Sequence, residues 1–164
     1  MSISLREITE EDEPFLSEVY ASTRADELAL VDWSAEQKAA FLRMQFEAQA
    51  RFYRESYRAA KFQVILLDDK PVGRFYIQRG KTGIHVIDIA ILPGYRGQGV
   101  GSHLLNQILE EAGSENLPVT IHVERMNPAM HLYERLGFYI LEEQGIHYLM
   151  EWRPLVREAG GHAG

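Results

Sequence analysis

A glycine-rich segment in the middle of the chain has the residue types that bind an anion. Residues 89–102 read IAILPGYRGQGVGS, so an apolar run leads into a turn with glycines at 97, 99 and 101. Glycines leave room for successive backbone N–H groups to point at one spot, and a following helix would direct its positive end there. Arg96 adds a charge-assisted donor. The segment therefore predicts a phosphate or pyrophosphate site.

Two common phosphate-binding motifs do not fit this segment. A P-loop places a lysine and a serine or threonine after its last glycine, whereas Gly101 is followed directly by Ser102. A dinucleotide-binding turn has the spacing G-x-G-x-x-G, whereas the glycines here are spaced G-x-G-x-G. The acidic residue expected at the tip of the following strand is also missing.

The segment resembles the acetyl-CoA signature of the GNAT N-acetyltransferase superfamily. The pattern R-x-x-G-x-G at residues 96–101 follows a strand that ends in I-A-I-x-P. A second block, N-P-A-x(4)-Y-E-x-x-G-F at residues 127–138, supports the resemblance, which covers roughly residues 3–152. It implies an N-acetyltransferase that uses acetyl-CoA as co-substrate and needs no metal.

The resemblance also implies which residues hold the co-substrate. The backbone of Gln98–Ser102 would bind the pyrophosphate, and the backbone of Ile91 and Leu92 would pair with the pantetheine arm. Asn127, in the second block, would also contact the co-substrate. The full implied set is Ile91, Leu92, Arg96, Gly97, Gln98, Gly99, Val100, Gly101, Ser102, Asn127 and Tyr133.

Acetyl transfer from a thioester to an amine needs a base for the amine and an acid for the leaving thiolate. The chain has no cysteine, so direct attack by the amine is the simplest route. The resemblance makes Tyr133 the acid and places His85 where relatives carry a base. Asp88 is the rival base, and a solvent relay without a dedicated base is the third reading. A backbone N–H near Ile91 would stabilise the oxyanion.

Acceptor selection in the family falls to the helices between the first two strands. There, Glu27 and Trp33 would suit a cationic amine through ion pairing and a cation–π contact. The alternative is a charged linker in which Trp33 packs on the following helix. Glu124, at an alternate position to His122 in the fifth strand, is a third acceptor candidate. The expected acceptor is a small polar or cationic primary amine; the alternatives are a protein N-terminus or lysine, or a non-catalytic acyl-CoA-binding module.

The sequence around these residues indicates the strands and helices that must position them. A period of two marks strands, and apolar residues three or four apart mark helices. The predicted strands are Ser2–Glu7, Phe62–Leu67, Val72–Gln78, Ile84–Leu92, Val119–Glu124, Phe138–Leu141 and Ile146–Trp152. The predicted helices start near Thr9, run from the capping pair Ser34 and Gln37 to about Tyr57, from about Gly101 to Ala112, and from Pro128 to Leu136. The sequence is also compatible with two helices that meet at a bend in place of the long second helix.

These elements predict an α/β fold with a mixed sheet. Short turns join the second, third and fourth strands, which must be antiparallel, whereas a helix joins the fourth to the fifth, which makes that pair parallel. A ligand is expected at the carboxyl ends of the fourth and fifth strands. The resemblance implies a GNAT-like, mostly antiparallel sheet of about seven strands, helices on both faces, and strands four and five splayed at the cofactor site.

Composition limits the class of protein. The chain has 164 residues, 46% hydrophobic and 25% charged, which fits one domain at residues 1–153 with a flexible tail at 154–164. A net charge of -7 disfavours a nucleic-acid partner. We expect no membrane span and no signal peptide, and we expect a cytoplasmic protein whose partner is a small amine acceptor. A homodimer is compatible with the sequence.

Overall fold

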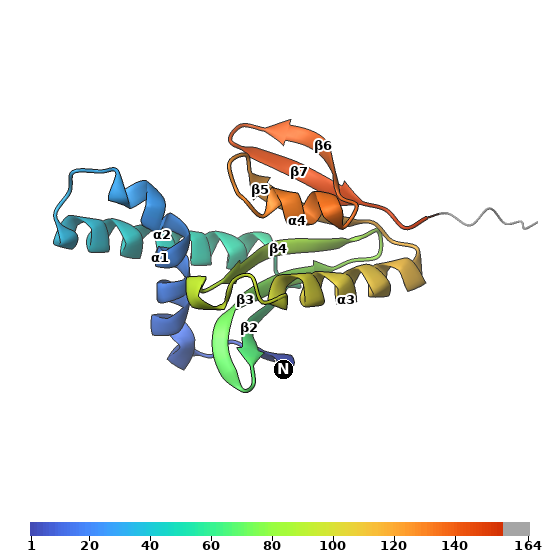
Figure 1. The fold of residues 1–164 in the computed structure, drawn as a ribbon, viewed down its shortest axis with the longest axis horizontal. Coiled ribbons are helices and arrows are strands. Elements are labelled where there is room, and N and C mark those ends of the chain that lie inside the picture. Colours follow the sequence, from blue (N-terminus) through green and yellow to red (C-terminus); the bar gives the residue numbers. More distant parts are fainter. Residues whose placement is uncertain (156–164) are drawn as a thin grey trace, which may run out of the picture. The chain divides into compact units, whose positions relative to one another are not determined.

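The computed structural model describes residues 1–155; from residue 156 onwards, the predicted tail lies outside the described residues. Figure 1 shows the elements in chain order. They are β1 (Ile3–Glu7), η1 (Glu10–Asp12), α1 (Glu13–Ala29), α2 (Ala35–Ser56), β2 (Lys61–Leu67), β3 (Lys70–Arg79), β4 (Ile84–Ile91), η2 (Pro93–Tyr95), α3 (Val100–Glu115), β5 (Val119–Glu124), α4 (Met130–Arg135), β6 (Tyr139–Gln144) and β7 (His147–Trp152).

The strands form one mixed sheet, which confirms the predicted fold class. Their order is β1-β2-β3-β4-β5-β7-β6. β1 and β2 pair antiparallel, as do β5 with β7 and β6 with β7, whereas β4 and β5 pair parallel. The parallel ladder joins Ile84 to Val119, His85 to Thr120 and Val86 to Ile121. Pairing therefore covers only the start of these two strands, in agreement with their predicted splaying.

The chain divides into two compact units. The first comprises residues Met1–Tyr76 and Asp88–Val100, and the second comprises Ile77–Ile87 and the chain from Gly101. β3 and β4 contribute residues to both units. The glycine-rich turn falls in the first unit up to Val100.

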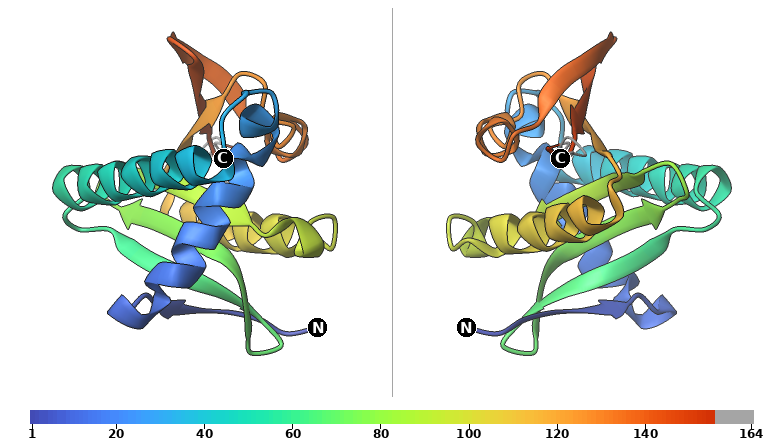
Figure 2. Two further views of the ribbon diagram at one scale, coloured as in Figure 1. Left: turned by 90° about the vertical axis from the view of Figure 1, so that its left-hand side faces the viewer. Right: turned by 90° about the vertical axis from the view of Figure 1, so that its right-hand side faces the viewer.

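In the first unit, α1 and α2 cross each other beside strands of the sheet (Figures 1 and 2). Leu16 and Tyr20 of α1 form an apolar cluster with Phe46 of α2. α2 is one helix from Ala35 to Ser56, so the bend that the sequence left open is not present. Its predicted capping box is confirmed: Gln37 N–H donates to Ser34 Oγ (3.1 Å), and Ser34 N–H donates to Gln37 Oε1 (2.9 Å).

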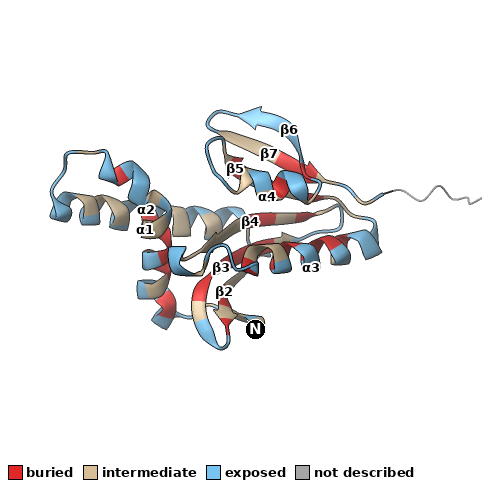
Figure 3. Ribbon diagram, in the orientation of Figure 1, coloured by how far each residue is buried: buried red, intermediate tan, exposed pale blue. Residues whose placement is uncertain are grey.

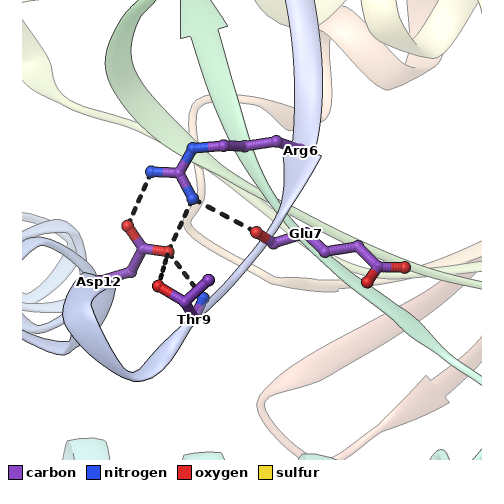
Figure 4. Close-up of polar contacts among 4 residues, drawn as sticks. All are labelled: Arg6, Glu7, Thr9 and Asp12. Carbon is purple, nitrogen blue, oxygen red and sulfur yellow. Dashed lines mark hydrogen bonds and ion pairs between the residues drawn. The ribbon is translucent and has the colours of Figure 1, made fainter.

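A charged clamp fixes the connection between β1 and α1 (Figure 4). Arg6 Nη1 and Nη2 donate to Asp12 Oδ2 and Oδ1, each at 2.8 Å. Asp12 Oδ2 also accepts from the Thr9 N–H at 2.8 Å. These bonds lower the pKa of Asp12 to about 2, with the bond from Arg6 as the largest cause. The short connection is thereby held in one conformation.

In the second unit, α3 and β5 supply most of the buried apolar side chains. Figure 3 shows buried and exposed positions interspersed along α3, as an amphipathic helix requires. α3 continues to Glu115, beyond the predicted end at Ala112. Asn116 then takes a left-handed φ of 56°, and Leu117 N–H donates to the Ala112 carbonyl (2.9 Å), an arrangement that ends a helix.

The C-terminal hairpin closes the second unit. β6 extends to Gln144, three residues past its predicted end, and every one of its residues is exposed (Figure 3). α4 is shorter than predicted, because Pro128 and Ala129 form a turn ahead of it. Within residues 1–155 each helix is either too short or too polar to span a bilayer.

Candidate active site

The glycine-rich turn has a backbone that favours glycine at two positions. Gly97 and Gly99 have φ values of 77° and 82°, in the left-handed region where side chains are strained. A Cβ added at either would meet no atom within 4 Å. The N–H groups of Gly97, Gln98 and Gly99 have no backbone acceptor in the described chain. The turn therefore leaves both donors and space.

α3 begins directly after this turn, at Val100. The first N–H groups of a helix have no acceptor within it, and they carry the positive end of the helix dipole. Gly101 and Ser102 contribute two of these groups. The donors and the open space of the turn fit the pyrophosphate of acetyl-CoA.

Arg96 also has a structural role that the sequence did not show. Its Nε donates to the Ile91 carbonyl at 2.8 Å, which ties the turn to the end of β4. The residue is exposed, and its Nη groups make no hydrogen bond within residues 1–155. Leu92 donates its N–H to the Val72 carbonyl (2.8 Å) and accepts from the Tyr95 N–H (2.9 Å). The edge that would meet the pantetheine arm is thus held by β3 and by the turn.

Gly73 of β3 is a further requirement of this edge. A Cβ at this position would lie 2.3 Å from the Ala90 carbonyl oxygen and 3.1 Å from the Ile91 Cα. Only glycine permits this approach of β3 to β4. The signal in the sequence is an isolated glycine inside a predicted strand.

The second unit brings the predicted base His85 together with His122. His85 Nδ1 lies 2.8 Å from Thr120 Oγ1, and the His85 and His122 rings meet edge to face with centroids 5.1 Å apart. His122 Nε2 lies 3.0 Å from Gln144 Oε1. Burial, and secondly the charge of His122, lower the pKa of His85 from 6.5 to about 4. His85 is therefore neutral at pH 7, the state that a base requires.

Asp88, the rival base, is engaged elsewhere. Its Oδ2 accepts from Arg74 Nη2 and from the Tyr53 hydroxyl, both at 2.8 Å. Burial, and secondly the charge of Asp88, raise the pKa of Tyr53. Arg74 Nη2 also donates to Gln49 Oε1 (2.8 Å). These bonds compensate the buried charge of Arg74, which gives Asp88 a structural role.

Tyr133 and Asn127 belong to the second sequence block. Tyr133 lies in α4 with 4% of its surface exposed, and its ring packs against that of Phe138 at 6.0 Å. Asn127 Oδ1 accepts from the Ala129 N–H (2.9 Å), and its carbonyl accepts from the Met130 N–H (3.1 Å). Asn127 therefore shapes the turn that leads into α4.

Comparison with known proteins agrees with this geometry. The family model described as "Acetyltransferase (GNAT) family" matches residues 8–138. The chain belongs to the GNAT family. It is accordingly an N-acetyltransferase of the class that uses acetyl-CoA.

Solved structures show the same GNAT fold. The PaiA N-acetyltransferase of Thermoplasma acidophilum, in complex with coenzyme A, is 19% identical with a TM-score of 0.69, over 93% of this chain and 99% of that one. The histone acetyltransferase HPA2 and related acetyltransferase of Corynebacterium glutamicum is 22% identical (TM-score 0.66; 96% and 99%). An acetyltransferase of Thermus thermophilus is 21% identical (TM-score 0.63; 94% and 98%).

The candidate acceptor residues of this GNAT protein have local partners. Glu27 is paired with Arg24 at 3.0 Å, and its side chain is 62% exposed. Trp33 contacts Phe41 edge to face, with centroids 5.3 Å apart, as in the reading that packs it on the following helix. Glu124 ends β5 and lies opposite His147 of β7. No cluster of three or more His, Cys, Asp or Glu in residues 1–155 could hold a metal ion.

Proposed function

We propose that this GNAT protein transfers the acetyl group of acetyl-CoA directly to the primary amine of a small polar or cationic acceptor. The observation that carries the proposal is the turn at Gly97–Gly99, where open left-handed glycines and N–H groups without backbone acceptors precede a 16-residue helix. In this proposal residues 1–153 act as one catalytic domain in the cytoplasm, which suits a chain without cysteine.

The proposed roles follow from the chemistry of the side chains. Acetyl-CoA supplies the activated thioester. His85, whose lowered pKa keeps the imidazole neutral at pH 7, takes the amine's proton. The Tyr133 hydroxyl donates a proton to the sulfur as the carbon–sulfur bond breaks and the carbon–nitrogen bond forms. The backbone near Ile91 stabilises the oxyanion.

The test is release of free thiol from acetyl-CoA across a panel of amines: amino acids, polyamines, aminoglycosides, aromatic amines and short peptides with free N-termini. Release with one class of small amine supports the proposal. Release only with peptides would favour a protein acceptor instead. Binding of acetyl-CoA without any release would favour the non-catalytic module.

Tyr133→Phe tests the acid. Turnover should fall by roughly 10²-fold or more, with little change in the Kd for acetyl-CoA. Tyr148→Phe is the matched control, because the Tyr148 ring contacts Arg125 and its hydroxyl makes no hydrogen bond within residues 1–155. Full turnover in Tyr133→Phe would remove this residue from the mechanism.

Gly99→Asp tests the turn. It places a side chain and a negative charge in the pyrophosphate site, so calorimetry should detect no binding of acetyl-CoA. Gly145→Asp is its control: Gly145 also has a left-handed φ (65°) and open space around a Cβ, but lies in the β6–β7 turn. Equal binding by the two variants would contradict the proposed site.

A further inference from the structure

The side chains around His85 come from one face of the sheet in the second unit, and the proposed mechanism uses only His85 itself. His85 pairs with Thr120 in the parallel ladder of β4 and β5, and paired residues direct their side chains to the same face of a sheet. His122 follows two residues later on β5, so its side chain lies on that face as well. Two residues of the neighbouring strand therefore flank the imidazole of His85.

The imidazole of a histidine needs contacts with its surroundings to keep one orientation. Rotation about its Cβ–Cγ bond has broad minima, because this bond joins an sp³ carbon to an sp² ring. Half a turn about the bond exchanges Nδ1 with a carbon atom. A general base acts only when its nitrogen is within reach of the proton, so the orientation of the ring decides whether His85 can act.

The hydroxyl of Thr120 supplies such a contact. His85 Nδ1 lies 2.8 Å from Thr120 Oγ1, which is hydrogen-bond distance. Both side chains are partly buried, so water competes for this bond less than it would at the surface. A hydroxyl can donate or accept, so it can stay bonded to Nδ1 when His85 gains or loses a proton. The bond is therefore compatible with the whole cycle of a base.

The ring of His122 restricts His85 in a different way. The two imidazole rings meet edge to face, with their centroids 5.1 Å apart. His122 is itself held from β6, where Gln144 Oε1 lies 3.0 Å from its Nε2. The ring contact limits how far the imidazole of His85 can tilt, whereas the bond to Nδ1 fixes which edge of the imidazole faces β5.

The backbone beneath this hydrogen bond is firmly held. His85 and Thr120 form the middle pair of the ladder. The pairs before and after it are almost fully buried: Ile84 with Val119, and Val86 with Ile121. Functional side chains on strands are positioned more precisely than those on loops. A hydroxyl at residue 120 can therefore hold the base in a constant place.

We propose that Thr120 is a positioning residue for the base: its hydroxyl holds the imidazole of His85 in the orientation that takes the proton of the amine. Thr120 acts through His85 and needs no contact with acetyl-CoA or with the acceptor. The inference rests on the proposed function, in which His85 is the base.

The first test is a double-mutant cycle on thiol release, with an amine that the wild type acetylates. Thr120→Val removes the hydroxyl and should lower kcat roughly 10- to 100-fold, the cost of a misplaced catalytic group, with an unchanged Kd for acetyl-CoA. Thr120→Ser keeps a hydroxyl and should restore most of the turnover. In His85→Gln, the further change Thr120→Val should cost nothing more. Full turnover in Thr120→Val, or an equal loss in the His85→Gln background, would overturn the inference and leave acetyl transfer itself intact.

The second test needs no turnover. Proton–nitrogen correlation spectra of the protein without acetyl-CoA record the ¹⁵N shift of His85 Nδ1, which responds to a hydrogen bond at this atom. The shift should change in Thr120→Val and stay near that of the wild type in Thr120→Ser. Thr82→Val is the control for both tests, because Thr82 is exposed in the β3–β4 turn and its hydroxyl makes no hydrogen bond within residues 1–155. The same Nδ1 shift in the wild type and Thr120→Val overturns the inference. A changed shift in a protein that acetylates no amine would refute the proposed function, and the role of Thr120 with it, while the hydrogen bond stands.

Discussion

His85 gives the sharpest test of the site's electrostatics, through the dependence of stability on pH. Its pKa is lowered from 6.5 to about 4, first by burial and second by His122. Between these values the unfolded chain binds a proton that the folded chain does not. The contribution of His85 to stability is therefore fully present above pH 6.5 and is lost as the pH falls towards 4.

The size of the effect follows from the two pKa values. A pKa difference of one is worth about 1.4 kcal/mol. Between pH 7.5 and pH 4.5, protonation of the unfolded chain at His85 should cost the folded state about 2.5 kcal/mol. His85→Gln removes this titration, so its stability should fall by about that much less over the same interval.

The assay is urea unfolding followed by circular dichroism at pH 7.5 and pH 4.5. The control is His131→Gln, because His131 is exposed and should leave the wild-type difference unchanged. If His85→Gln loses as much stability between the two pH values as wild type, His85 is not buried in its neutral form. His122→Gln should raise the pKa of His85, and should move the acid limb of kcat/KM to higher pH if His85 is the base.

Three further predictions concern other contacts. Asp88→Asn leaves the buried Arg74 without its counter-ion and should lower the free energy of unfolding by about 3–5 kcal/mol. The folded protein should keep its turnover if Asp88 is not the base. Loss of turnover in fully folded Asp88→Asn would make Asp88 a candidate base again. Gly73→Ala should weaken both stability and acetyl-CoA binding, because its Cβ would meet the Ala90 oxygen, whereas Gly94→Ala, with no atom within 4 Å, should leave both unchanged. Equal melting temperatures and Kd values for those two variants would refute the close approach. The wild type should lose stability as the pH falls from 3.8 towards 2, because folding lowers the pKa of Asp12 to about 2, and Asp12→Asn should show a smaller loss. Thermal melts at pH 2.5, 3.5 and 5 check this. The same dependence of melting temperature on pH in both proteins would contradict it.

Local patterns were sufficient to predict the order of the elements. Alternation in residues 119–124 marks β5, and the Ser34–Gln37 pair marks the start of α2. The connections between strands also predicted which pair is parallel. The ends of the elements were predicted less well. α3 ends where Asn116 takes a left-handed φ, and the spacing of apolar residues does not predict that position.

The contacts between distant residues had no such signal. Arg74 and Asp88 are 14 residues apart and meet because β3 and β4 are neighbours in the sheet. Tyr53 and Asp88 are 35 residues apart, and only the packing of α2 on the sheet brings them together. The sequence could therefore place Asp88 on a strand face, but could not show that two donors occupy its carboxylate. The roles of Tyr133 and His85 come from the family resemblance and stay predictions.

The exposed strand β6 has a consequence for the colloidal behaviour of the protein. β6 is an edge strand of the sheet, with β7 as its neighbour, and its residues Tyr139, Ile140 and Leu141 are exposed to solvent. An open strand of this kind can add a strand from another molecule and so begin aggregation. The carboxylate of Glu142 opposes that association by charge repulsion, which salt screens. Concentrated solutions of this protein should therefore stay clear at low ionic strength and become turbid as salt is added.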